Sequence, residues 1–296
     1  MGNLAQNFIN ALTLGSTYAL VAVGFTLVFG VLRLVYLGHA AVIAACAYVG
    51  YGVLRATGSV TLALVAGIVS GGILGLLVEW MAIRPVRGQH HLIPMVTSAS
   101  FAIVVHELLR IFVAGGQSIA YPEAFTSTVI RFKLGDQTPY FTVGQLAVLL
   151  VTAAMVVALT WIVRKTWMGR AIRAVADSEQ AASLLGVRVN ATSARTLMLA
   201  SMLAGAAGVL LGLTIAAIDP HFSTPLEFKA IAIVLFAGMG SIPAAVVGAY
   251  LLGFVESFAV VFLDTSYRDL FAYLVMIVIL MVRPDGLMGR RVSQRV

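Results

Sequence analysis

The sequence is short of charge: Asp, Glu, Lys and Arg make up 10% of its 296 residues, against about 25% in soluble domains. Hydrophobic residues make up 60%, where soluble domains have about 45–50%. One soluble core of this size cannot bury the excess, and a bilayer is the simpler solvent for it. Apolar segments recur from Phe8 to Val282, so the composition predicts a single membrane domain, residues 1–296.

Residues and motifs for catalysis are also scarce. Cys46 is the only cysteine, which excludes an internal disulfide and a thiolate metal cluster. Neither Gly-x-Ser-x-Gly nor His-Glu-x-x-His occurs. A P-loop needs Gly-Lys-[Ser/Thr], and none of Lys133, Lys165 and Lys229 follows a glycine. We therefore expect no enzyme activity, catalytic residue, metal or cofactor, and any ATP hydrolysis must occur on another polypeptide.

Long apolar stretches dominate what is present. A spanning helix needs about 20 mainly apolar residues. The candidates are residues 8–31, 35–54, 60–83, 92–113, 143–163, 195–217, 243–263 and roughly 269–282. Residues 228–238 are apolar but too short to cross alone. The pattern predicts an all-α, polytopic membrane helix bundle of about eight spanning helices and one half-length, broken or re-entrant helix. The first stretch precedes the first basic residue, Arg33, and is expected to be a retained helix rather than a cleaved signal.

The net charge of +7 indicates how the helices are oriented in the membrane rather than nucleic-acid binding, because Lys and Arg collect in the cytoplasmic loops of membrane proteins. With the C-terminus inside, nine of the 19 basic residues fall in inside loops and four in the tail, against six outside. This bias predicts the N-terminus outside and the C-terminus in the cytoplasm. Residues 115–142 then form a periplasmic loop, with a short hairpin expected at 126–134, and residues 165–194 form a cytoplasmic loop.

The cytoplasmic loop contains a short helix, Ser178–Leu185. Asp177 is the expected N-cap, Gln180 the residue that completes a capping box, and Gly186 the C-terminal stop. Ala181, Leu184 and Leu185 then share one side of the helix. An apolar face outside the bilayer needs either a protein partner or the lipid headgroups, and the pattern leaves both open.

Two further features are candidates for the pathway or its hinges. Gly238 and Gly240 allow positive φ, Ser241 can cap a helix, and Pro243 suits its first turn. This glycine break is either pathway lining or a plain turn. Glu256 is an acid well inside an apolar span, without an obvious local partner, and such residues are functional candidates.

The order of several motifs resembles LivH-type permeases of high-affinity branched-chain amino acid ABC transporters over nearly the whole chain. Residues 169–177 and 182–186 resemble the cytoplasmic coupling loop of that family. Residues 12–20, 82–87, 238–243 and 283–289 resemble its opening helix, first inside turn, glycine break and C-terminal exit. The chain departs from the family pattern at Ala41, where an acid is expected, and at Ala237, where a glycine is expected.

The resemblance implies the permease subunit of an ATP-driven importer for branched-chain or related amino acids, a multi-pass protein of the inner membrane. Its implied partners are two ATP-binding cassette ATPase subunits, a homologous second permease, a periplasmic substrate-binding protein and the lipid bilayer, with no nucleic acid. The residues implied to couple to the ATPases are Gly169, Arg170, Arg173, Asp177, Ser178, Glu179, Gln180, Ala181, Leu184, Leu185 and Gly186. The alternative is an ion- or proton-coupled secondary transporter, which would also have broken helices and buried acids.

Overall fold

The computed structural model describes residues 4–90, 92–115, 117–122, 129–131, 139–215, 217–238, 240–262, 268–283 and 286. The α-helices in these ranges are α1 (Leu4–Leu32), α2 (His39–Thr57), α3 (Val60–Val78), α4 (Leu92–Leu109), α5 (Val143–Lys165), α6 (Trp167–Asp177), α7 (Glu179–Leu184), α8 (Val189–Ile215), α9 (Thr224–Ala237), α10 (Ile242–Phe262) and α11 (Arg268–Val282). Two π-helical turns, Glu79–Ile83 and Arg110–Ala114, extend α3 and α4, and a 3₁₀ turn covers Arg84–Val86. The prediction of an all-α polytopic bundle is confirmed.

Seven helices are long and apolar enough to cross a membrane in the part of the chain that is described: α1, α2, α3, α4, α5, α8 and α10. The eighth predicted span corresponds to α11, whose 15 residues extend about 22 Å at 1.5 Å per residue. The half-length segment corresponds to α9, whose 14 residues extend about 21 Å. Both are shorter than the hydrocarbon core of about 30 Å.

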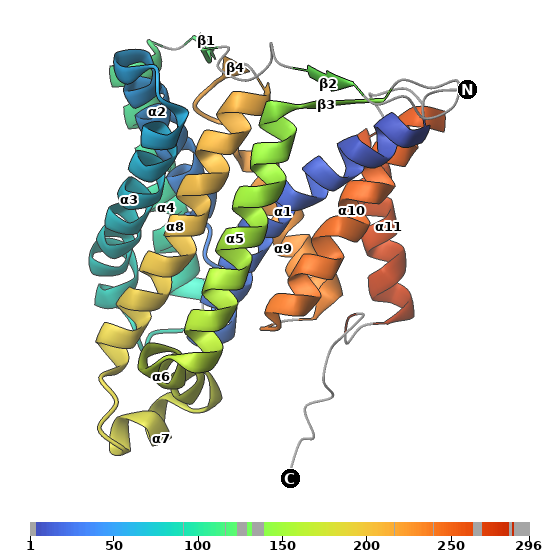
Figure 1. Cartoon of the computed structure of the whole chain (residues 1–296). Coiled ribbons are helices and arrows are strands. Elements are labelled where there is room, and N and C mark those ends of the chain that lie inside the picture. The colour runs from blue at the N-terminus through green and yellow to red at the C-terminus, as the bar shows by residue number, and fades with distance from the viewer. Residues whose placement is uncertain are drawn as a thin grey trace.

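The two ends of the bundle differ in structure (Figure 1). Among the described residues, one end has four short strands: β1 (Ile119–Ala120) pairs with β4 (Ala217–Ile218) and β2 (Val129–Arg131) pairs with β3 (Tyr140–Thr142), both antiparallel. The other end has α6 and α7. The chain between β4 and α10 runs from the strand end toward the α6–α7 end (Figure 1). Helix α9 makes up most of this path, and the turn that precedes α9 makes up the rest. In the predicted hairpin, Val129–Arg131 is a strand, while residues 126–128 and 132–134 lie outside the described residues.

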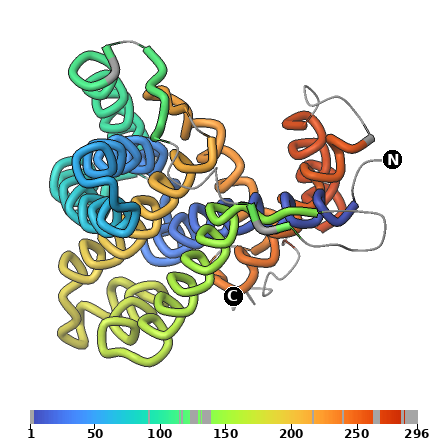
Figure 2. Tube along the Cα trace, turned by 45° about the horizontal axis from the view of Figure 1, so that its top comes forward, coloured from blue at the N-terminus to red at the C-terminus, as the bar shows by residue number. Residues whose placement is uncertain are grey.

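The long helix α1 runs obliquely between two groups of helices. Figure 2 shows α2, α3 and α4 together on one side and α10 and α11 on the other. The packing of α3 on α8 depends on small residues. A Cβ added at Gly71 would lie 2.2 Å from the Ser201 carbonyl oxygen, and one at Gly205 would lie 2.1 Å from the Gly67 carbonyl oxygen. Glycines let membrane helices approach this closely, and the glycine face of α3 packs against α8 of the same chain.

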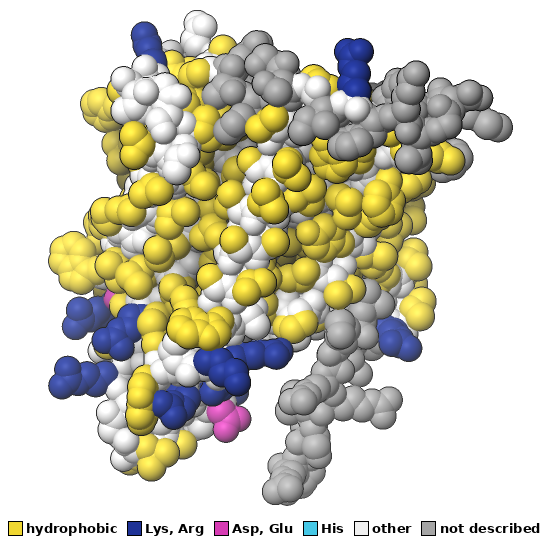
Figure 3. Space-filling view, in the orientation of Figure 1, with side chains coloured by type: hydrophobic (Ala, Val, Ile, Leu, Met, Phe, Trp, Pro, Cys, Tyr) yellow, Lys and Arg dark blue, Asp and Glu magenta, His cyan; other side chains and the backbone are white. Residues whose placement is uncertain are grey.

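The surface divides into an apolar belt and a basic end. Yellow side chains cover the middle of the molecule in Figure 3, and dark blue Lys and Arg gather where α6 and α7 lie. Large exposed apolar side chains such as Ile73, Val96 and Leu150 are typical of a lipid-facing surface. The belt and the seven apolar helices indicate a multi-pass membrane protein.

Candidate functional site

The short helix at the basic end differs in its start from the prediction. Asp177 is the last residue of α6, an 11-residue helix that the sequence reasoning missed, and it is not the N-cap of α7. Ser178 is that cap, because its extended backbone (φ −153°, ψ 114°) separates the two helices and its Oγ accepts from the Ala181 N–H at 3.2 Å. The third helical position is therefore Ala181, so Gln180 cannot complete a capping box.

The predicted end of this helix is confirmed. Gly186 has φ +84°, its N–H donates to the Ser183 carbonyl, and the Val187 N–H donates to the Ala182 carbonyl, both at 3.0 Å. This is the Schellman arrangement that needs a left-handed residue after the helix. Ala182 is buried, whereas Leu184 and Leu185 are 88% and 84% exposed. The helix is thus anchored on one side and presents two leucines on the other, beside the exposed Glu179, Gln180 and Ala181.

The first half of the predicted coupling motif holds the corner between α5 and α6. Gly169 is buried, and a Cβ there would lie 2.2 Å from the Val163 carbonyl oxygen. Arg173 donates to that same carbonyl, and the Arg170 guanidinium stacks 3.5 Å from the centre of the Trp167 ring. The contacts of Gly169 and Arg173 with the Val163 carbonyl fix the direction of α6 relative to α5, whereas Arg170 stacks on Trp167 within α6 itself.

The end of α6 is bonded to the end of α1. Arg33, the residue after α1, has a positive φ of 51°. Its Nη2 donates to the carbonyls of Ala176 and Asp177, both at 3.0 Å. A cation at the last carbonyls of a helix satisfies orphan acceptors and is favoured by the helix dipole. The end of α6 is therefore joined to the end of α1 by two hydrogen bonds from one side chain.

The glycine break has the predicted backbone. Gly238 and Gly240 have φ of +115° and +81°, the Ser241 Oγ accepts from the Ala244 N–H at 3.5 Å, and Pro243 is the second residue of α10. A Cβ added at Gly30 of α1 would lie 3.2 Å from the Gly240 Cα. The break is thus a close contact between the start of α10 and α1, and Gly238, Gly240, Ser241 and Pro243 are not among the residues that line the cavity described below.

Glu256 has partners that the sequence did not indicate. It is fully buried, its Oε1 lies at an ion-pair distance of 2.9 Å from Lys229 Nζ, and its Oε2 is 2.9 Å from Arg268 Nε. Tyr18 donates its hydroxyl to Oε2 at 2.7 Å. Lys229 also donates to Tyr18 Oη at 3.1 Å and to Asp269 Oδ1 at 2.7 Å. Residues of α1, α9, α10 and α11 thus form one ion network.

A second buried carboxyl group, that of Glu227, connects the N-terminal ends of α9 and α2. Glu227, in the first turn of α9, accepts from the His39 backbone N–H at 3.1 Å, at the start of α2. Nearby, the Ser223 hydroxyl donates to the Ala40 carbonyl at 2.8 Å. Gly38 caps α2 without a side-chain hydrogen bond, so the Glu227 carboxyl group supplies an acceptor for an N–H group at the buried N-terminus of α2. This junction fixes α9 against α2 beside the ion network.

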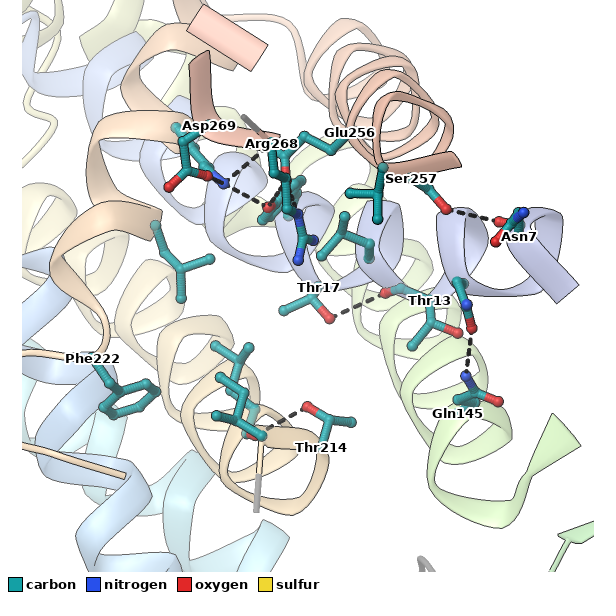
Figure 4. Close-up of a pocket in the computed structure, with 18 residues that line it drawn as sticks. Asn7, Thr13, Thr17, Gln145, Thr214, Phe222, Glu256, Ser257, Arg268 and Asp269 are labelled. Atoms are coloured by element: carbon teal, nitrogen blue, oxygen red, sulfur yellow. Dashed lines mark hydrogen bonds and ion pairs between the residues drawn. The ribbon is translucent and has the colours of Figure 1, made fainter. Parts of the chain in front are cut away.

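The ion network lies at one end of a cavity of about 560 Å³. Figure 4 shows Glu256, Arg268 and Asp269 together, with Thr13, Thr17, Gln145 and Thr214 along the same hollow. The walls come from α1, the start of α5, the end of α8, α9, α10 and the start of α11. Ligand pockets typically have volumes of about 300–1,000 Å³ and combine apolar walls with a few convergent polar groups. The cavity has both the size and the lining for a small solute.

Of the predicted site residues, only Glu256 lines this cavity. Lys229 and Arg268 are two of the six basic residues that the charge bias places outside, and the sequence gives them, Tyr18 and Asp269 no further role. One signal was available: Lys229 lies inside the apolar segment 228–238, where an ionisable residue calls for a partner. The partners of Lys229 are 27 and 40 residues further along the chain or on α1, so only the fold reveals them.

Known transport proteins are similar to this chain over nearly its whole length. The family model described as "Branched-chain amino acid transport system / permease component" matches residues 7–280. The high-affinity branched-chain amino acid transport system permease protein LivH of Escherichia coli is 32% identical, over 98% of this chain and 97% of its own length. The permease protein BraD of Pseudomonas aeruginosa is 29% identical with the same coverage.

A solved structure shares the fold. PsaBC from Streptococcus pneumoniae in complex with Fab matches with a TM-score of 0.52 and 16% identity, over 96% of this chain and 93% of that one. At this identity the match concerns the fold alone.

Proposed function

Because the chain belongs to the family of branched-chain amino acid transport permease components, we propose that it is the membrane-spanning subunit of an ATP-driven importer for branched-chain or related amino acids. The observation that carries the proposal is the end-to-end similarity to permease proteins of such systems. The helix bundle, its apolar belt and its polar cavity are consistent with a solute pathway.

The proposal requires other subunits. The sequence has no P-loop, so the energy must come from two ATP-binding cassette ATPases. A homologous second permease completes the pathway, and a periplasmic binding protein delivers the amino acid. In this arrangement the chain is one permease domain, with residues 115–142 in the periplasm and 165–194 in the cytoplasm.

The basic end supports this orientation. Exposed Arg84, Arg164, Arg170 and Arg188 lie at or next to the helix ends near α6 and α7, as Figure 3 shows for that end as a whole. Basic residues favour the cytoplasmic side. Since α1 begins at the strand end and α11 ends toward the α6–α7 end, the proposed topology has the N-terminus outside and the C-terminus inside.

In the proposed coupling, the ATPases bind α7. Leu184 and Leu185 insert into an apolar cleft on the motor, and closure of the motors on ATP moves the α6–α7 pair. Arg33 passes this movement to the inner end of α1. The outer half of α1 lines the cavity, so a rigid-body movement of α1 changes the access to it.

A secondary transporter is the competing function, and the buried Glu256–Lys229 pair is the observation that favours it. Proton-coupled carriers use buried ionisable chains of this kind. The two functions differ in their energy source and in their need for a motor on α7.

Removal of the apolar contact at α7 tests the proposal. Burying each leucine contributes about 1.5–3 kcal/mol, so the double variant Leu184→Asp/Leu185→Asp is expected to lose its ATPases and ATP-driven uptake. Membrane insertion is expected to stay unchanged, because α7 lies outside the apolar belt. The matched control is Leu184→Met/Leu185→Met, which keeps both side chains apolar and of similar volume and is expected to retain the ATPases. The measurement is co-purification of the ATPases with the membrane-extracted permease, and a double variant that retains them would refute the coupling role of α7.

A further inference from the structure

We propose that the cavity beside the ion network is a binding site for one zwitterionic amino acid with an aliphatic side chain. In this site Arg268 binds the α-carboxylate and Asp269 binds the α-ammonium. The assignment rests on the proposed function and adds the residues that would hold the solute during its passage.

The exposures of the four charged side chains divide them into two pairs. Lys229 and Glu256 are 6% and 0% exposed, whereas Arg268 and Asp269 are 36% and 61% exposed. The inner pair is thus part of the protein interior, and the outer pair faces the cavity and its solvent. Arg268 and Asp269 are consecutive residues at the start of α11, and both are among the residues that line the cavity (Figure 4).

Both outer charges keep bonding capacity. A guanidinium has five N–H donors, and the bond to Glu256 uses Nε, so the planar fork can still bind a carboxylate. Asp269 is bonded to Lys229 through Oδ1, and a carboxylate has about four acceptor positions. A solute carboxylate and ammonium can therefore join the network without breaking the inner pair.

The charge balance favours a zwitterion over a simple ion. The network has two cations and two anions, so its formal charge is zero, and an added anion or cation would leave one uncompensated charge in a partly buried place. A zwitterion brings both signs at once, and Arg268 and Asp269 offer one partner of each sign in the lining of the cavity. The solute therefore enters without changing the net charge.

The rest of the cavity has an apolar part that suits an aliphatic side chain and a polar part through which a solute can enter from water. One part of its lining is apolar: Leu14, Leu211, Ile215, Phe222, Leu226 and Val260. Another part is a polar row on one face of α1, Asn7, Asn10, Thr13 and Thr17, at the three- and four-residue spacing that puts side chains on one side of a helix. Apolar burial supplies affinity and the polar row allows entry from water.

Protection of a single cysteine tests the assignment in the assembled transporter. Thr214→Cys, in a Cys46→Ala background, places an exposed thiol in the cavity wall. L-leucine is expected to slow its alkylation, while leucinamide, which lacks the carboxylate, and 4-methylpentanoate, which lacks the ammonium, leave the rate unchanged. Arg268→Gln and Asp269→Asn are each expected to weaken protection by L-leucine about tenfold, since each removes a charge-assisted bond. Equal protection by all three compounds, or none by L-leucine, would refute the site.

Two controls separate the site from general damage and from the proposed function. Arg110→Gln removes the exposed Glu107–Arg110 ion pair of α4, which does not line the cavity, and is expected to leave protection unchanged. Val260→Trp fills the cavity without changing its charge and is expected to abolish both protection and uptake, while Val260→Ala retains them. If the wild-type complex imports L-leucine with ATP but Val260→Trp imports it equally well, the site is wrong and the function stands. If the wild-type complex imports no amino acid, the proposed function itself fails.

Discussion

The ion network makes a quantitative prediction for Lys229. Replacing it by Met removes one ion pair to Glu256, one to Asp269 and a hydrogen bond to Tyr18, and it leaves Glu256 fully buried with Arg268 as its remaining cation. Breaking one side of a buried ion pair costs about 3–5 kcal/mol, and hydrogen bonds between membrane helices average about 0.6 kcal/mol. Because Arg268 still compensates Glu256, we expect the lower end, about 3 kcal/mol.

A double-mutant cycle separates this charge effect from lost packing. Glu256→Gln combined with Lys229→Met removes both charges of the inner pair and leaves Arg268 with Asp269, so the network stays neutral. The double variant is expected to be less destabilised than the sum of the single variants by about 1–3 kcal/mol, the usual range for residues in one network. The assay is the unfolding free energy in mixed micelles, followed by tryptophan fluorescence during a titration with SDS. Additive effects within about 0.5 kcal/mol would show that the two residues do not interact energetically.

Two further predictions concern packing and topology. Gly71→Ala is expected to destabilise the chain by about 1–3 kcal/mol through overpacking, because the new Cβ meets the Ser201 carbonyl. The control Gly52→Ala is expected to be neutral or slightly stabilising, because a Cβ there has no neighbour within 4 Å. Equal effects of the two variants in the same SDS titration would contradict the close α3–α8 packing. Single cysteines at Gln117 and Ser183 in a Cys46→Ala background are expected to react with an impermeant reagent from opposite sides of the membrane, and labelling from one side would reject the proposed orientation.

The helices could be predicted because their signal is local. Each apolar stretch in the sequence coincides with a helix to within a few residues, and Gly186 and Gly238 end their helices as glycines at positive φ do. The N-cap of α7 was wrong by one residue, because Asp177 and Ser178 are both good caps and the choice depends on where α6 ends. Helix α6 was missed although a signal was available: Met168, Ile172 and Val175 recur at the three- and four-residue spacing of an amphipathic helix.

The candidate site could be predicted only in part because its bonds connect distant segments. Glu256 was identifiable as an acid in an apolar span, but its partners come from α1, α9 and α11. The same limit applies to Glu227, which caps α2 from a position 188 residues away. The glycines of α3 were recognisable as a packing face, while their partner, α8, follows from the fold.

The most direct test of the central claim is uptake of radiolabelled L-leucine into proteoliposomes that contain this permease with its second permease, its two ATPases and its binding protein. We expect uptake that requires ATP and every subunit, no uptake by this chain alone, and loss of uptake in Leu184→Asp/Leu185→Asp. Uptake by the isolated chain under a proton gradient without ATP would contradict the proposed function and identify a secondary transporter.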